Sequence, residues 1–208
     1  AIALTFAGAA TSAPVNDASL FRADYLTGFS SPTGLRFTGP NEGFVIEKGG
    51  GVKFFSGSNV STALNLSVNT ESERGLLGIA LDPGFASNKT VYLYYSEGTS
   101  TTWTANRLNR YTWNGTSLVE TPFATARTFG TAADGFTQNG PNHNGGPLVF
   151  GTDGKLYGVT GDLNRNAIEQ NQSTTVSAQT AGVYRLNTDG TVPGDNPFVS
   201  HSEAGVRP

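Results

Sequence analysis

The sequence predicts an all-β protein built from short antiparallel strands, as in a sandwich, a barrel or a propeller. Segments rich in Val, Ile, Leu, Tyr and Phe recur about every ten residues and are separated by glycine-containing turns. Helical signals are scarce, because no window combines an apolar stripe at i, i+3, i+4 and i+7 with caps at both ends. Similar segments at 34–37, 78–81 and 147–150 loosely fit four-stranded propeller blades of about 40–50 residues.

The predicted strands fall into hairpins whose connections carry Gly, Asp, Asn or Pro, the residues that turns prefer. These strands span residues 43–47, 52–55, 76–81, 91–96, 108–113, 148–150, 156–160 and 183–186. The turns contain KGGG at 48–51, DPGF at 82–85, NG at 114–115, DG at 153–154 and NTDG at 187–190. Asn114-Gly115 is the signal of a two-residue hairpin. Residues 121–142 are rich in Gly, Ala and Thr and are predicted to form a long loop, which is usually functional.

Composition limits the classes of function. Charged residues make up 14% of the 208 residues, against about 25% in average soluble domains. The net charge of −3 is unclustered, so no basic face for nucleic acid is expected. The chain has no cysteine, which excludes disulfides, redox CxxC motifs and thiolate metal sites.

Residues 1–20 form an apolar segment distinct from the domain predicted for residues 21–208. Residues 1–10 are apolar and are followed by the small residues 11–13, which resembles a secretory signal without its basic leader. The alternative is an ordinary first strand. The run is too short to span a bilayer core of about 30 Å. We expect a secreted or periplasmic protein without a membrane span. The five Asn-x-Ser/Thr sites would bear on this only if the host glycosylates secreted proteins.

Residues 142–148 (NHNGGPL) are the most informative segment, because they contain one of only two histidines. Gly145 and Gly146 follow it, where a flat ligand could approach the backbone closely. A second polar loop, GDLNRN at 161–166, follows a predicted strand. Rigid strands that carry polar loops are how a β-scaffold presents a catalytic base.

Four segments in order give the chain a family resemblance. They are PTGLRF at 32–37, ERGLLGIALDPGF at 73–85, the His143 segment, and GVYRLNTDGTVPGDNP at 182–197. With these segments the chain resembles the soluble pyrroloquinoline-quinone (PQQ) sugar dehydrogenases, the glucose/sorbosone dehydrogenase family, over about residues 28–207. The resemblance implies a six-bladed β-propeller, of which about three blades are present. We therefore expect an N-terminal fragment, or a propeller completed by a second chain or by self-assembly.

The resemblance also implies roles for three residues. His143 would act as the general base that takes the proton of the anomeric hydroxyl, and imidazole suits this because its pKa lies near about 6.5. Asp162 would orient that histidine, although a turn-forming role is the alternative. Arg207 would stabilise negative charge on the reduced quinone, but Pro208 follows it where the family has Asn, and a solvated terminal arginine is the alternative.

Cofactor contacts are implied for the residues next to the base. Asn142 and Asn144 flank it, although many relatives have an acidic residue at the first of these positions. Glu73 stands where relatives often have an amide, and a carboxylate beside anionic PQQ is unfavourable unless Arg74 or a cation compensates. The family's Ca²⁺ polarises PQQ, and its ligands are expected beyond Pro208. Asp162-x-Asn164-x-Asn166 has alternating oxygens but lacks the Gly and Glu of an EF-hand, so no metal ligand is identified.

Three functions remain open from the sequence. The first is a PQQ-dependent oxidoreductase that oxidises an aldose at the anomeric C1 hydroxyl to a lactone and passes electrons to an external acceptor. The second is a non-catalytic extracellular propeller that binds carbohydrate or protein. The third is a structural subunit of an extracellular assembly, in which the apolar first residues add a strand to a neighbour.

Overall fold

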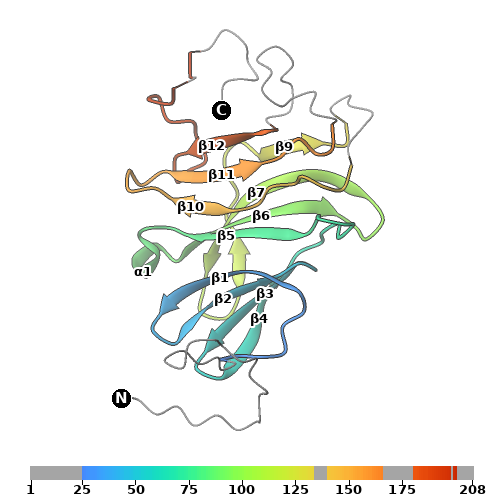
Figure 1. Ribbon diagram of the computed structural model, residues 1–208. Helices are drawn as coiled ribbons and strands as arrows, with labels where there is room; N and C mark the ends of the chain where they lie inside the picture. Colours follow the sequence, from blue (N-terminus) through green and yellow to red (C-terminus); the bar gives the residue numbers. More distant parts are fainter. Residues whose placement is uncertain (1–24, 134–139, 166–179, 198, 201–208) are drawn as a thin grey trace, which may run out of the picture.

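Three antiparallel sheets make up the protein in a computed structural model that describes residues 25–133, 140–165, 180–197 and 199–200. The sheets are stacked face to face, as Figure 1 shows. The prediction of an all-β fold is therefore confirmed. The segment 1–20 and Arg207 lie outside the described residues.

The first sheet has strand order β1-β2-β3-β4. The strands are β1 (Pro32–Gly39), β2 (Glu42–Glu47), β3 (Gly51–Ser56) and β4 (Asn59–Asn65). The predicted hairpin across KGGG is confirmed as β2 and β3, which pair in antiparallel register. Strand β4 was not predicted, because its half-polar sequence lacks a sustained alternation.

The second sheet is the central one, and its five strands include β9, which pairs with β7. The strands are β5 (Leu76–Leu81), β6 (Thr90–Gly98), β7 (Trp103–Trp113), β8 (Leu118–Glu120) and β9 (Arg127–Thr131), with the short helix α1 (Phe85–Asn88) between β5 and β6. Two predictions are corrected here. Residues 121–142 are not one structureless loop, because they contain β9. Asn114-Gly115 is part of a longer turn, in which the Asn114 side chain accepts the N–H groups of Thr116 and Ser117.

The third sheet contains β10 (Leu148–Phe150), β11 (Leu156–Thr160) and β12 (Gly182–Leu186) in that order. The DG turn joins β10 and β11 as predicted, with Gly154 at φ 71°, where glycine is favoured. Because β10 and β11 are antiparallel, the segment that enters β10 and the segment that leaves β11 lie at the same edge of the sheet.

Strand β6 contributes to both hydrophobic cores, because its side chains alternate between the two faces of the central sheet. Its odd-numbered residues Val91, Leu93 and Tyr95 pack in the core between the first and second sheets. Its even-numbered residues Tyr92 and Tyr94 pack in the core between the second and third sheets. Successive side chains of a strand point to opposite faces, so a strand buried on both faces reads as a continuous apolar run.

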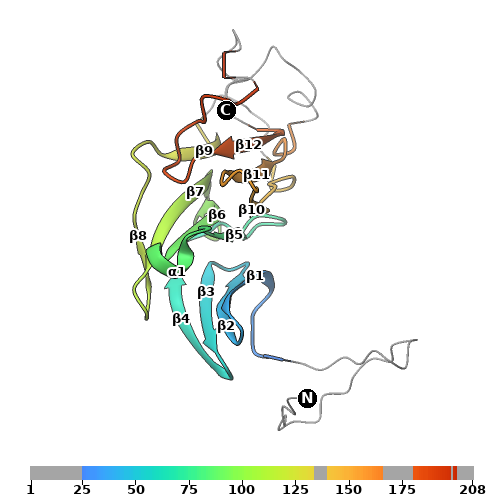
Figure 2. The ribbon, with the colours of Figure 1, turned by 90° about the vertical axis from the view of Figure 1, so that its left-hand side faces the viewer.

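The first strands of the three sheets lie next to one another, since β5 contacts both β1 and β10. This is the arrangement of propeller blades around a common axis, and Figure 2 shows it from the side. It also brings the segments that precede β5 and β10 together. The backbone contact is close: a Cβ built on Gly78 of β5 would lie 2.0 Å from the carbonyl oxygen of Gly146.

The two outermost sheet faces carry exposed apolar side chains. On the first sheet, Phe37 is 55% exposed beside a groove of about 470 Å³ lined by Leu35, Val45 and Phe55. On the third sheet, Val183 is 70% exposed. Contiguous apolar surface of this kind promotes association in water.

We expect the 208-residue chain in isolation to self-associate through these faces. The double variant Leu35→Thr/Phe37→Ser should shift sedimentation toward the monomer, because it removes apolar area from one face. Val119→Ser is the matched control, since Val119 is 51% exposed on β8 and away from both faces. Equal association of all three proteins would contradict the expectation.

Candidate active site

His143 and Asp162 form a hydrogen-bonded pair at one edge of the third sheet. His143 lies in the segment that enters β10, and Asp162 directly follows β11. The imidazole Nδ1 is 2.7 Å from Asp162 Oδ1. The imidazole side chain is 53% exposed, whereas the Asp162 side chain is 3% exposed. The ring is therefore accessible, and the carboxylate that orients it is buried.

This arrangement determines which nitrogen can act as a base. A carboxylate accepts but does not donate, so the neutral imidazole donates its proton from Nδ1 to Asp162. The other nitrogen, Nε2, then carries the free lone pair. A carboxylate at this distance also stabilises the imidazolium that forms when Nε2 takes up a proton. The structure thus brings together the two residues that the resemblance pairs as base and orienting group.

Backbone strain is concentrated at this pair. His143, Leu163 and Asn164 have φ values of 60°, 54° and 59°, in the left-handed region that non-glycine residues rarely adopt. Local hydrogen bonds hold them. The Asn164 N–H donates to Asp162 Oδ1 at 3.3 Å, and its own Oδ1 accepts the N–H of Asn142 at 2.8 Å. Strained residues that the surroundings hold in place occur preferentially at functional sites.

The two glycines after the histidine pack against neighbouring strands. Gly145 has φ 75°, and a Cβ at this position would lie 2.2 Å from the carbonyl oxygen of Val159 in β11. Gly146 has φ 130°, and a Cβ there would lie 2.6 Å from the Leu77 Cβ in β5. The sequence-based expectation is that a flat ligand could approach the backbone at these glycines. The structure shows that the space toward which a side chain would point is already filled by protein atoms.

Asn144 directly follows His143 in the loop, and its side chain is turned into the protein, with only 1% of the residue exposed. Its Nδ2 donates to the Pro141 carbonyl at 2.7 Å, and its Oδ1 accepts from Asn106 Nδ2 at 3.2 Å. The Tyr94 hydroxyl donates to the Asn144 backbone carbonyl at 2.8 Å. Burial raises the pKa of Tyr94 far above its ordinary value, so this hydroxyl stays protonated and remains a donor. These bonds connect the loop to the hydrophobic core through β6.

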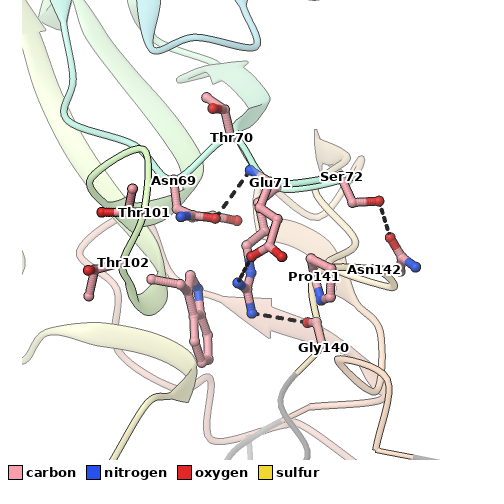
Figure 3. Close-up of polar contacts among 12 residues, drawn as sticks. Asn69, Thr70, Glu71, Ser72, Thr101, Thr102, Gly140, Pro141 and Asn142 are labelled. Atoms are coloured by element: carbon pink, nitrogen blue, oxygen red, sulfur yellow. Dashed lines mark hydrogen bonds and ion pairs between the residues drawn. The ribbon is translucent and has the colours of Figure 1, made fainter.

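The segment 71–74, which enters β5, holds the same loop from the other side. Glu73 Oε2 accepts the backbone N–H of His143 at 2.6 Å, and the Glu73 N–H donates to the Pro141 carbonyl at 3.3 Å. The Ser72 hydroxyl bonds the side-chain oxygen of Asn142, and the two side chains point toward each other in Figure 3. This contact surface joins residues about seventy positions apart in the sequence.

Arg74 supports the loop from within the protein. Its guanidinium donates to the Gly140 carbonyl at 3.0 Å, pairs with Glu71 at 3.2 Å and lies 4.5 Å from the centre of the Trp103 ring. Burial lowers its pKa, an effect that the Glu71 carboxylate partly opposes. A guanidinium held in this way fixes the start of the loop that carries His143.

Six of the seven predicted site residues therefore meet at one place, and Arg207 lies outside the described residues. Asn142 and Glu73 share the accessible edge with His143, whereas Asn144 and Arg74 are buried beneath it. Their contacts with a cofactor stay predictions. The sequence pattern did not predict the supporting roles of Ser72, Tyr94, Asn106 and Asn164. Ser72 and Asn164 lie within two positions of predicted site residues, whereas Tyr94 and Asn106 have no such signal.

The described residues fit the base side of a quinone site. An accessible imidazole braced by a buried carboxylate supplies the proton acceptor that alcohol oxidation requires. Within the described ranges, no group of three or more His, Cys, Asp or Glu side chains is placed to hold a metal ion.

Comparisons with known proteins agree with this geometry. The profile of the Glucose / Sorbosone dehydrogenase family matches residues 29–207. The chain belongs to this family. Its sequence is 30% identical to quinoprotein glucose dehydrogenase B of Acinetobacter calcoaceticus over 158 residues, 64% of this chain and 31% of that protein. It is 26% identical to human Hedgehog-interacting protein over 183 residues, 80% of this chain and 25% of that protein.

A solved family structure shows the same fold. The PQQ-bound aldose sugar dehydrogenase of Streptomyces coelicolor superposes with a TM-score of 0.65 at 26% identity, over 84% of this chain and 49% of that one. The prediction of a partial quinoprotein-type propeller with about three blades is thereby confirmed. This glucose/sorbosone dehydrogenase chain spans no more than about half the length of the relatives it matches.

Proposed function

We propose that this chain carries the base-bearing part of a PQQ-dependent sugar dehydrogenase. The enzyme oxidises an aldose at its anomeric C1 hydroxyl to the lactone and passes two electrons to an external acceptor. The observation that carries the proposal is the accessible His143 ring held by the buried Asp162 carboxylate at 2.7 Å. Membership of a family that contains quinoprotein glucose dehydrogenases supports the cofactor and the substrate class.

In the proposed reaction His143 takes one proton, and the hydride acceptor would be supplied by PQQ bound at this site. The sugar C1 hydroxyl donates a hydrogen bond to Nε2, and its proton passes to this nitrogen as the C1–H bond breaks. The C1–O bond becomes a carbonyl, so the sugar loses two electrons and two hydrogens. Asp162 keeps the ring oriented throughout and stabilises its positive charge. Water returns the imidazole to its neutral form.

The remaining assignments follow the family resemblance. Asn142 and Glu73 lie at the accessible edge and are proposed to contact the cofactor, with Asn144 and Arg74 supporting them from beneath. Arg207 is proposed to stabilise charge on the reduced quinone, and Ca²⁺ to be held by residues outside the described ranges. We propose a secreted or periplasmic location. In the described part of the chain, no helix has the length and apolar character needed to span a bilayer.

Reconstitution tests the function. In the protein that carries this chain, PQQ and Ca²⁺ together should give glucose-dependent reduction of an electron-accepting dye. Removing the metal with a chelator should abolish it, because a bound Ca²⁺ would supply Lewis-acid polarisation to the quinone. Failure of PQQ to support any sugar oxidation in that protein would contradict the proposal.

Asp162→Asn should lower kcat by about 10²-fold while the thermal stability changes little. Asparagine can hydrogen-bond the ring but does not neutralise an imidazolium, and it no longer favours the Nδ1–H tautomer. Asp153→Asn is the matched control, because this exposed carboxylate lies at the opposite end of the β10–β11 hairpin. Equal kcat values for the two variants would contradict the orienting role of Asp162.

A second candidate function is a non-catalytic extracellular propeller that binds carbohydrate or protein. The similarity to human Hedgehog-interacting protein over 80% of this chain favours it. Under this alternative PQQ does not bind, and the His143–Asp162 pair serves only the fold. The proposed structural subunit depends on residues 1–20, and deletion of residues 1–14 would abolish its polymer.

A further inference from the structure

We propose that Glu73 is a positioning residue for the base, acting through the backbone of His143. The inference rests on the proposed function and gives Glu73, besides its proposed cofactor contact, a role in holding the loop that carries His143. Its foundation is the 2.6 Å hydrogen bond from the His143 N–H to Glu73 Oε2. The resemblance implied a cofactor contact for Glu73, whereas the geometry gives its carboxylate a role in the loop.

The bond is strong because its acceptor is charged. A hydrogen bond to an ionised carboxylate is shorter and about twice as strong as one between neutral groups. Glu73 also donates its own N–H to the Pro141 carbonyl at 3.3 Å. The two bonds join Glu73 to Pro141 and His143, the residues on either side of Asn142. Two contacts therefore fix the orientation of the loop.

His143 is consequently held at three separate points. Asp162 holds the ring at Nδ1, Glu73 holds the backbone N–H, and the N–H of Leu163 donates to the backbone carbonyl at 3.4 Å. The residue has φ 60°, a conformation that a non-glycine residue keeps only where its surroundings enforce it. Loss of the Glu73 bond removes one of the two backbone restraints, and the ring then samples orientations that do not face the sugar.

The same bond explains why a carboxylate is tolerated at this position. A free carboxylate close to an anionic cofactor would repel it. Here the N–H of His143 provides a partial positive charge directly against Oε2. A glutamine at position 73 can still accept this hydrogen bond through its amide oxygen, so the bond can be kept while the charge is removed. This property makes Glu73→Gln the rescue variant for Glu73→Ala.

The first measurement is hydrogen exchange of the His143 amide in the 208-residue chain, followed by NMR and independent of any cofactor. Glu73→Ala should speed exchange by about tenfold or more, and Glu73→Gln should stay within about threefold of the unmodified chain. Glu120→Ala is the matched control, since this exposed carboxylate of β8 bonds Asn109 and not the loop. Unchanged exchange in Glu73→Ala, or equally fast exchange in Glu73→Gln, would overturn the proposal.

The second measurement separates kcat from KM in the reconstituted protein that carries this chain. Glu73→Ala should lower kcat by about tenfold or more with KM for the sugar nearly unchanged, and Glu73→Gln should restore most of kcat. An unchanged kcat beside accelerated amide exchange would overturn the positioning role. If His143→Ala itself keeps full turnover, the proposed function fails, whereas the amide exchange still decides whether Glu73 holds the loop.

Discussion

Replacing His143 with alanine is expected to lower kcat for PQQ-dependent sugar oxidation by about 10²–10⁴-fold. The variant removes the exposed imidazole that is proposed to take the anomeric proton. Water must then accept the proton without the orientation that Asp162 provides. Dye-reduction kinetics with glucose, at saturating PQQ and Ca²⁺, measure the loss.

Two further variants distinguish the loss of a base from the loss of structure. His143→Gln keeps an amide that can donate to Asp162 but has no basic nitrogen, so it should be as inactive as alanine and more stable to heat. Buried Asp162 loses its hydrogen bond to the imidazole in the alanine variant, which should cost about 1–3 kcal/mol of stability. His201→Ala, which changes the other histidine of the sequence, should keep normal turnover. Normal turnover of His143→Ala would disprove the proposed base.

Gly145→Ala is expected to destabilise the protein by about 2–5 kcal/mol. Two costs add at this position. The backbone has φ 75°, which alanine adopts only with strain, and the new Cβ would lie 2.2 Å from the Val159 carbonyl oxygen. Chemical denaturation followed by tryptophan fluorescence gives the free energy of unfolding.

Gly154→Ala is the matched control, and it separates the two costs. Gly154 has a similar φ of 71°, but no atom lies within 4 Å of a Cβ built there. It should therefore cost only the backbone strain, about 1–2 kcal/mol. Equal destabilisation by the two variants would show that crowding against β11 contributes nothing. A larger effect of Gly145→Ala would confirm that Gly145 allows the loop that carries His143 to pack closely against β11.

Most of the strand pattern could be predicted because it is a local property of the sequence. In β6, every residue from Val91 to Tyr95 is apolar, and only a strand buried on both faces accounts for such a run. The DG turn between β10 and β11 likewise follows from the conformational freedom of Gly154. Strand β9 was missed because its sequence RTFGT is short and half polar, and only its pairing with β7 makes it a strand.

The sequence by itself determined the fold class and the family and pointed to His143 as the proposed base, because periodicity and a contiguous motif are readable without coordinates. Only the tertiary structure decided how that base is held. Glu73 and His143 are 70 residues apart, and they meet because β5 and β10 are neighbouring first strands of adjacent sheets. The burial of Asn144 and Arg74 and the crowding at Gly145 have the same origin. Each depends on contacts between segments distant in sequence, which no local pattern of residues encodes.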